Sequence, residues 1–305
     1  MPQTSSSEDS EHLQDPDFLS NSASMFNLRD VRALKASFCS THANYVIPRR
    51  TVNVPEEYIL PNIDHALLGR EDLDINQLSQ NNHIKTFINK LHKVVKNARL
   101  DIGTSEALTD TLVAHLIFLI VDFNQWPLEV KLHPTFKFSV GHAVLSVKAK
   151  FVIDYKNYSI LVVDVQNTRQ ATMTYDVIIF VVRVISTYVT FYRSVIHKGY
   201  WDELGIGCPR QQSITIFRWP GNSSVPFVGF DLAEPHGRKN VLEALCKIQN
   251  LLLVMPQTSS SEDSEHLQDP DFLSNSASMF NLRDVRALKA SFCSTHANYV
   301  IPRRT

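Results

Sequence analysis

The sequence predicts an α/β (or α+β) fold, in which a mixed β-sheet of four or more strands is flanked by helices. The prediction rests on two stretches with apolar residues at helical spacing, a run of extended stretches after them, and a last helical stretch near residue 250. Helices on both sides of a block of strands bury their apolar stripes against the sheet.

Residues 255–305 repeat residues 1–51 without a substitution. A solenoid repeats at a short period, whereas here one whole unit is followed by the opening of a second. We expect four parts in chain order: a disordered Ser- and acid-rich tail at 1–25, a partly helical extension at 26–81, an α/β domain at 82–254, and an unpacked copy of the N-terminus at 255–305.

The composition argues against several classes of function. The chain has 31 acidic and 30 basic residues, so no overall charge draws it to nucleic acid or to a membrane. Its nine glycines form no GxGxxG or GxxxxGK[ST] loop, so a nucleotide cofactor has no support. The longest apolar run, 112–121, is too short to cross a bilayer, and the N-terminus lacks the pattern of a signal peptide. We therefore expect an intracellular protein, cytoplasmic or nuclear, that is not secreted.

The first long helix is predicted at 82–100. Its apolar residues, among them Ile84, Phe87 and Leu91, recur on one side. The opposite side is basic, and it either lies along the phosphate backbone of DNA or RNA or simply faces water. The residues of this basic face are Lys85, Lys93, Lys96 and Arg99.

A second helix is predicted at 105–121. Thr104 or Ser105 can cap it, and Glu106 in the first turn suits the helix dipole. We expect this helix to lie against the sheet. Its predicted buried stripe is Leu108, Leu112, Leu116 and Leu119.

The strands are predicted after this helix, and a last helix at 238–252 closes the unit. Pro134 interrupts the first extended stretch, and 188–192 is interpreted as a prolongation of the fourth. The extended stretches are 128–140, 143–154, 159–166, 177–184 and 213–219.

One predicted hairpin, within 148–167, gathers polar residues at one end. If its turn takes residues 156–158, Lys150 lies opposite Asp164 because side chains alternate between faces. This end of the hairpin either forms a site or is simply solvated. The side chains on this face are Lys148, Lys150, Val152 and Asp154 of the first strand, and Ile160, Val162, Asp164 and Gln166 of the second.

Three features together resemble the PD-(D/E)XK (restriction-endonuclease-like) nuclease superfamily, most closely its fungal-type members. They are a capped helix with an early acid, a strand hairpin, and a second strand that ends in acid-x-polar (ILVVDVQ). The resemblance covers about residues 82–252. It implies that an acid on each hairpin strand binds Mg²⁺ and that a Lys two residues after the second acid helps to activate the attacking water.

The chain departs from the family's pattern in two places. Asp164 fills the second acid position, but Gln166 stands in place of the Lys and Lys150 in place of the first acid. Asp154 shares the face, although four residues at strand rise place it roughly 13 Å further along. Residues 167–176 are too few for the helix that the family places before the next strand, so this crossover helix is predicted to be missing.

The sequence therefore favours a degenerate nuclease-like domain with weak or no Mg²⁺-dependent hydrolysis of phosphodiesters. A working nuclease would hold Mg²⁺ on Glu106 and Asp164, with Asp154 as a further candidate ligand. Lys150 would then supply the positive charge that Gln166 lacks. The alternatives are a nucleic-acid-binding module that uses the basic helix face, and a product of a duplicated and partly deleted gene without a function.

Overall fold

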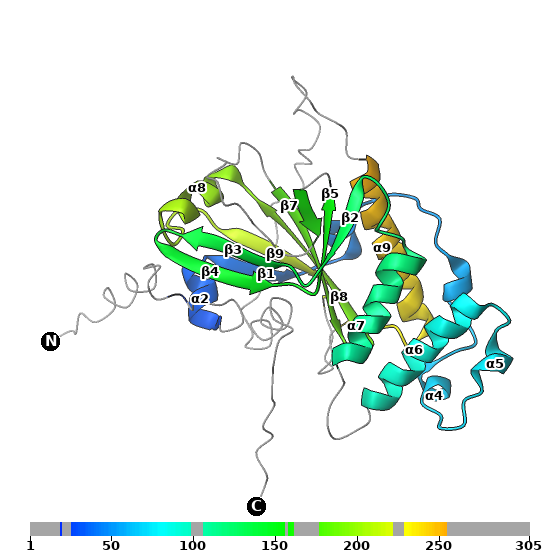
Figure 1. Cartoon of the computed structure of the whole chain (residues 1–305). Helices are drawn as coiled ribbons and strands as arrows, with labels where there is room; N and C mark the ends of the chain where they lie inside the picture. Colours follow the sequence, from blue (N-terminus) through cyan, green and yellow to red (C-terminus); the bar gives the residue numbers. More distant parts are fainter. Residues whose placement is uncertain are drawn as a thin grey trace, which may run out of the picture.

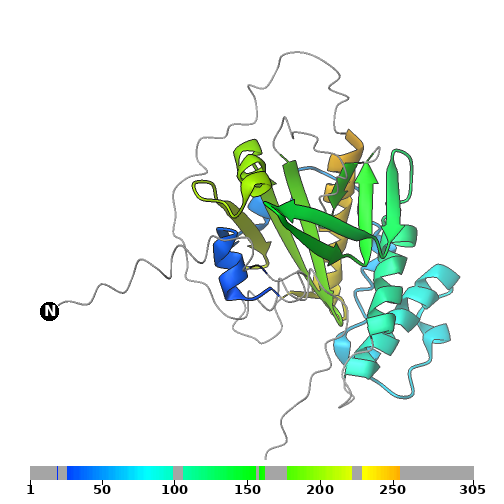
Figure 2. The same ribbon diagram turned by 60° about the vertical axis from the view of Figure 1, so that its left-hand side comes forward.

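A computed structural model of the chain describes Leu19 and residues 26–98, 106–155, 158–161, 177–221 and 229–254. In this part of the chain a mixed sheet lies between two covering layers (Figure 1, Figure 2). The predicted fold class, a mixed α/β sheet of four or more strands flanked by helices, is confirmed.

The main sheet joins distant parts of the chain. Its strands are β1 (Ala36–Ser40), β2 (Leu128–Leu132), β5 (Phe151–Tyr155), β6 (Tyr158–Leu161), β7 (Val177–Ile185), β8 (Tyr188–Ile196), β9 (Ile214–Trp219) and β10 (Phe230–Asp231). They follow the order β1-β9-β8-β7-β6-β5-β2, and β10 pairs with the start of β8. The pairs β1–β9 and β6–β7 are parallel, and the other neighbours are antiparallel. β1 and β2 are therefore the two edges.

The two faces of the sheet have different covers (Figure 1). The larger core lies under α6 (Asn82–Ala98), α7 (Glu106–His115) and α9 (Pro235–Val254), together with α3 (Ala43–Val46), η3 (Glu56–Tyr58), α4 (His65–Leu68) and α5 (Ile75–Leu78). The other core lies under α2 (Leu28–Ala33), α8 (Lys198–Ile206) and the separate hairpin of β3 (Thr135–Val140) and β4 (Ala143–Lys148). Within the described ranges, none of these helices has the length and apolar character needed to cross a membrane.

The predicted helices are present, with one difference in the buried stripe. α7 continues past His115 as a π-helical segment, η4 (Leu116–Ile120). Because a π-turn holds more residues than an α-turn, it rotates the side chains that follow it. Leu119 is therefore 58% exposed, and its predicted burial was wrong, whereas Ile117 and Val121 are buried.

Where they are described, the extended stretches form strands, with two corrections. The stretch 143–154 divides into β4 and β5, because the chain leaves the sheet between them at Ala149 and Lys150. The stretch 188–192 does not prolong β7. It opens β8, which returns antiparallel after a tight turn in which Ser186 has a φ of +55°.

The central hairpin also differs from the prediction at its turn. Tyr158 was assigned to the turn, but it pairs with Tyr155 as the first residue of β6. A register shift next to Asp154 then aligns Ile153 with Leu161. This is the register that was predicted for the hairpin, although residues 162–176, with most of its second strand, lie outside the described residues.

The segment 26–81 contributes a strand that the sequence did not predict. The helical pattern around Val31 forms α2, and β1 then adds a parallel strand next to β9. Further along, Tyr58 and Leu68 are buried in the larger core. This segment therefore shares a sheet and a core with residues 82–254.

A buried guanidinium joins three segments near the start of α9. Arg238 has no exposed surface, and burial lowers its pKa to about 10 although nearby carboxylates oppose the shift. All of its nitrogen atoms donate hydrogen bonds to backbone carbonyl oxygens, which satisfies the group without a direct ion pair. Nε donates to Ile59 (2.8 Å), Nη1 to Leu232 (2.8 Å) and Ala233 (2.9 Å), and Nη2 to Leu60 (2.9 Å) and Ile63.

His115 is a buried ionisable group at the end of α7. Its ring stacks on Phe87 with centroids 5.9 Å apart, and its Nε2 has no hydrogen-bond partner among the described residues. Burial, and then the positive charges of Lys90 and His83, lower its pKa to about 4. The imidazole is therefore neutral in the folded protein at pH 7.

This pKa predicts an acid-sensitive fold. Because the unfolded chain takes up the His115 proton near pH 6.5 and the folded chain only near pH 4, stability falls as pH drops through that window. At pH 5 the loss should be about 2 kcal/mol. We expect His115→Phe, which keeps the stack on Phe87, to remove this part of the pH dependence in urea unfolding. His142→Gln, at an exposed site, is the control and should leave the profile unchanged.

Candidate functional site

The first turn of α7 meets the lysine that precedes β5. The ammonium of Lys150 forms an ion pair with Glu106 and a second with Asp110, at 3.0 Å. Glu106 and Asp110 lie one helical turn apart, so both carboxylates point to the same side of α7. The structure thus brings together two of the predicted site residues, Glu106 and Lys150.

The ammonium of Lys150 is paired inside this cluster, which with two carboxylates keeps a net negative charge. Partial burial lowers the pKa of Lys150, but the hydrogen bonds and charges of Glu106 and Asp110 outweigh that effect and raise it. The lysine therefore stays protonated. Its positive charge stands beside the carboxylate of Glu106, which the working-nuclease alternative assigns to Mg²⁺.

Asp154 lies elsewhere, in a buried ion pair across the edge of the sheet. It is 2% exposed, and its Oδ2 lies 2.5 Å from Nζ of Lys131, on the neighbouring strand β2. The hydrogen bond to Asp154 raises the pKa of Lys131. The second oxygen, Oδ1, is buried without a hydrogen-bond partner among the described residues.

The two clusters face different layers. Ile153 packs in the larger core, the one that lies under α7. Because neighbouring side chains on a strand alternate, Asp154 points to the opposite face. Lys150 and Asp154 were predicted to share a face, but Lys150 precedes β5 and its ammonium reaches α7. That part of the prediction was wrong.

The remaining predicted residues are only partly described. Asp164, Gln166 and Arg99 lie outside the described residues, as do the predicted caps Thr104 and Ser105. No group of three or more His, Cys, Asp or Glu residues in the described ranges is placed to hold a metal ion. The Mg²⁺ site of a working nuclease therefore stays a prediction that depends on Asp164.

The basic face of α6 is present on the side away from the core. Lys93 is exposed and Lys85 is half-buried. Lys96 forms an ion pair with Glu71 at 2.5 Å, which offsets its charge. The face is therefore less positive than the sequence alone suggested.

Sequence reasoning missed two residues of these clusters. Asp110 could have been found from its helical spacing to Glu106. Lys131 could have been found from the alternation in the stretch LEVKL, but its partner across the strands depends on which strand is the neighbour of β5.

Comparison of the chain with models of protein families, with curated proteins and with solved structures gave no match.

The buried pair of Asp154 and Lys131 makes a stability prediction. Lys131→Met leaves a buried carboxylate without its cation, which should lower the free energy of unfolding by about 2 kcal/mol, since Lys131 itself is partly exposed. Lys131→Arg should keep most of the stability, and Asp154→Asn added to Lys131→Met should recover part of it. Urea denaturation followed by circular dichroism measures all four proteins. Equal midpoints for the wild type and Lys131→Met would show that the pair adds nothing to stability.

Proposed function

We propose that this chain is a degenerate nuclease-like domain that keeps the α/β scaffold and has little or no Mg²⁺-dependent phosphodiesterase activity. The observation that carries the proposal is the ammonium of Lys150 held between Glu106 and Asp110. This ammonium is paired with both carboxylates, whereas Mg²⁺ requires anionic oxygen ligands that are left for it to bind.

The order of the elements supports the nuclease-like part of the proposal. α7 is followed by three antiparallel neighbours, β2, β5 and β6, and β7 then lies parallel to β6. The resemblance implies the same succession of a helix, a strand hairpin, and a following strand reached by a parallel crossover. The hairpin β3–β4 is an insertion between β2 and β5.

The separation of the acids supports the loss of catalysis. Metal-assisted hydrolysis requires carboxylates that converge on one ion and a cation that helps to form hydroxide. In the described part of the chain, Glu106 and Asp154 each have their own lysine, on different faces of the sheet. Gln166 can hold a water molecule by hydrogen bonds but carries no charge.

Cleavage assays test the proposal. The full chain is incubated with plasmid DNA, single-stranded DNA and RNA in Mg²⁺ or Mn²⁺, beside the Asp164→Ala variant. We expect no difference in cleavage between the two proteins. Asp202→Ala, in an exposed helix turn of α8, controls for contaminating nuclease. Metal-dependent turnover that only Asp164→Ala abolishes would overturn the proposal in favour of a working nuclease.

The second candidate function is nucleic-acid binding without catalysis, and the lysines of α6 favour it. Lys93 is exposed at the middle of this face, where a phosphate backbone could reach it.

Fluorescence anisotropy with labelled DNA and RNA tests this candidate at two salt concentrations. If the face binds phosphates, changing Lys85, Lys93, Lys96 and Arg99 together to Gln should weaken binding at least about tenfold and lower its salt dependence. Lys198→Gln with Lys247→Gln, on α8 and α9, is the control. Equal affinity of the wild type and the fourfold variant would exclude the face.

A further inference from the structure

The edge of the sheet beside β9 is filled by an element that the chain encodes twice. α2 and β1, together with the residues at their ends, span Asn27 to Thr41. Residues 281–295 repeat this sequence without a change. The chain therefore carries the sequence of this element twice, and the N-terminal copy occupies the position beside β9.

The contacts that hold this element come from parts of the chain that occur once. Tyr200 donates a hydrogen bond of 2.7 Å from its hydroxyl to the carbonyl oxygen of Leu34. Arg218 donates one of 2.7 Å to the hydroxyl of Ser40. β1 pairs with β9 from Ala36 to Ser40 in parallel. The partners in these hydrogen bonds and in the strand pairing thus lie in residues 200–221, which occur once, whereas the element itself is repeated.

The shape of this surface is also specific for the element. Val31 is 2% exposed, in an apolar cluster with residues of β1 and β9. A Cβ atom on Gly221 would come within 2.9 Å of Cβ of Ser40 and of the backbone nitrogen of Thr41. Because Gly221 has no side chain, the end of the element at Ser40 and Thr41 can lie against it.

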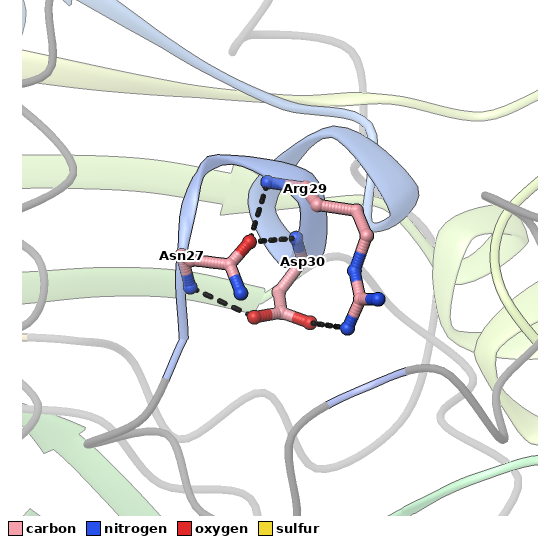
Figure 3. Close-up of polar contacts among 3 residues, drawn as sticks. All are labelled: Asn27, Arg29 and Asp30. Carbon is pink, nitrogen blue, oxygen red and sulfur yellow. Dashed lines mark hydrogen bonds and ion pairs between the residues drawn. The ribbon is translucent and has the colours of Figure 1, made fainter.

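The start of the element is capped by its own residues (Figure 3). Asn27 accepts hydrogen bonds from the backbone nitrogens of Arg29 (2.8 Å) and Asp30 (3.4 Å), and its own backbone nitrogen donates to Asp30 (2.7 Å). This capping box at the start of α2 is made by residues of the element itself. The repeat carries the same three residues as Asn281, Arg283 and Asp284.

We propose that residues 281–295 of the same chain can dock beside β9 in place of residues 27–41. The two sequences are identical, so every contact described above can form again. The chain between Val254 and Asn281 is long enough, because a flexible segment of this length has an end-to-end distance of roughly 30 Å and a fully extended one about 90 Å.

The two occupants differ only in how they are tethered. Residues 27–41 are followed at once by Val46 and Ile47, which are buried in the larger core. This short tether gives the N-terminal element the higher effective concentration at the site. The C-terminal element therefore takes the site when the N-terminal one is disabled.

Matched substitutions in the two occupants test the proposal in the full chain. Val31→Asp disables the N-terminal element by placing a charge in its apolar contact, and Val285→Asp makes the same change in the repeat. The double variant disables both, and Val241→Asp, at a buried position of α9 that occurs once, is the control. Thermal unfolding and light scattering are measured for each protein.

We expect either single variant to unfold close to the wild-type temperature, and the double variant and Val241→Asp to lose about 10 °C or more. Hydrogen exchange gives a direct readout, since Val31→Asp changes the mass of the N-terminal peptide and so distinguishes it from the repeat. Amides of 290–294 should become protected in that variant. Any of three results would overturn the proposal. The first is that Val31→Asp lowers the unfolding temperature as much as the double variant does, and the second is that the double variant is as stable as the wild type. The third is that the amides of 290–294 stay unprotected in Val31→Asp. A dimer in Val31→Asp would instead assign the docking to a second chain.

Discussion

The fully buried guanidinium of Arg238 is the constraint on which the arrangement of the larger core depends. It donates to carbonyl oxygens in 59–63 and in 232–233 while it sits in the first turns of α9. A charge can be kept in such a place only when every donor is satisfied, because an unpaired buried charge is very costly. These carbonyls therefore fix the position of α9 relative to η3 and β10.

The same requirement applies to the described acids that the sequence predicted as metal ligands. Each of the two candidate metal-binding acids in the described residues forms an ion pair with a lysine, Glu106 with Lys150 and Asp154 with Lys131. A catalytic metal site keeps several carboxylates close together and leaves them for the ion to neutralise. In the described residues these acids instead form ion pairs between helix and loop and between strands. Such pairs stabilise local structure, and they also remove the ligands.

The sequence predicted the elements better than their connections. Hydrophobic periodicity placed α6, α7 and α9, because it records which side of a helix is buried. It missed β1, whose sequence ASFCS has no alternation of large apolar residues and whose role depends on a distant partner, β9. In the site, the sequence predicted that Glu106 and Lys150 lie close together only because of the resemblance to nucleases. To identify Lys131 as the partner of Asp154, one must know that β2 pairs with β5, and no local sequence pattern shows this pairing.

The π-helical segment at Leu116–Ile120 has a consequence for how the chain tolerates changes in length. It holds one residue more than an α-helix needs between the buried residues Leu116 and Val121. Removing a residue such as Leu119, which is exposed, would leave Val121 one α-helical turn after Leu116 and so keep both in the core. This segment is therefore a place in the domain where a single-residue deletion inside a helix would preserve the packing on each side of it.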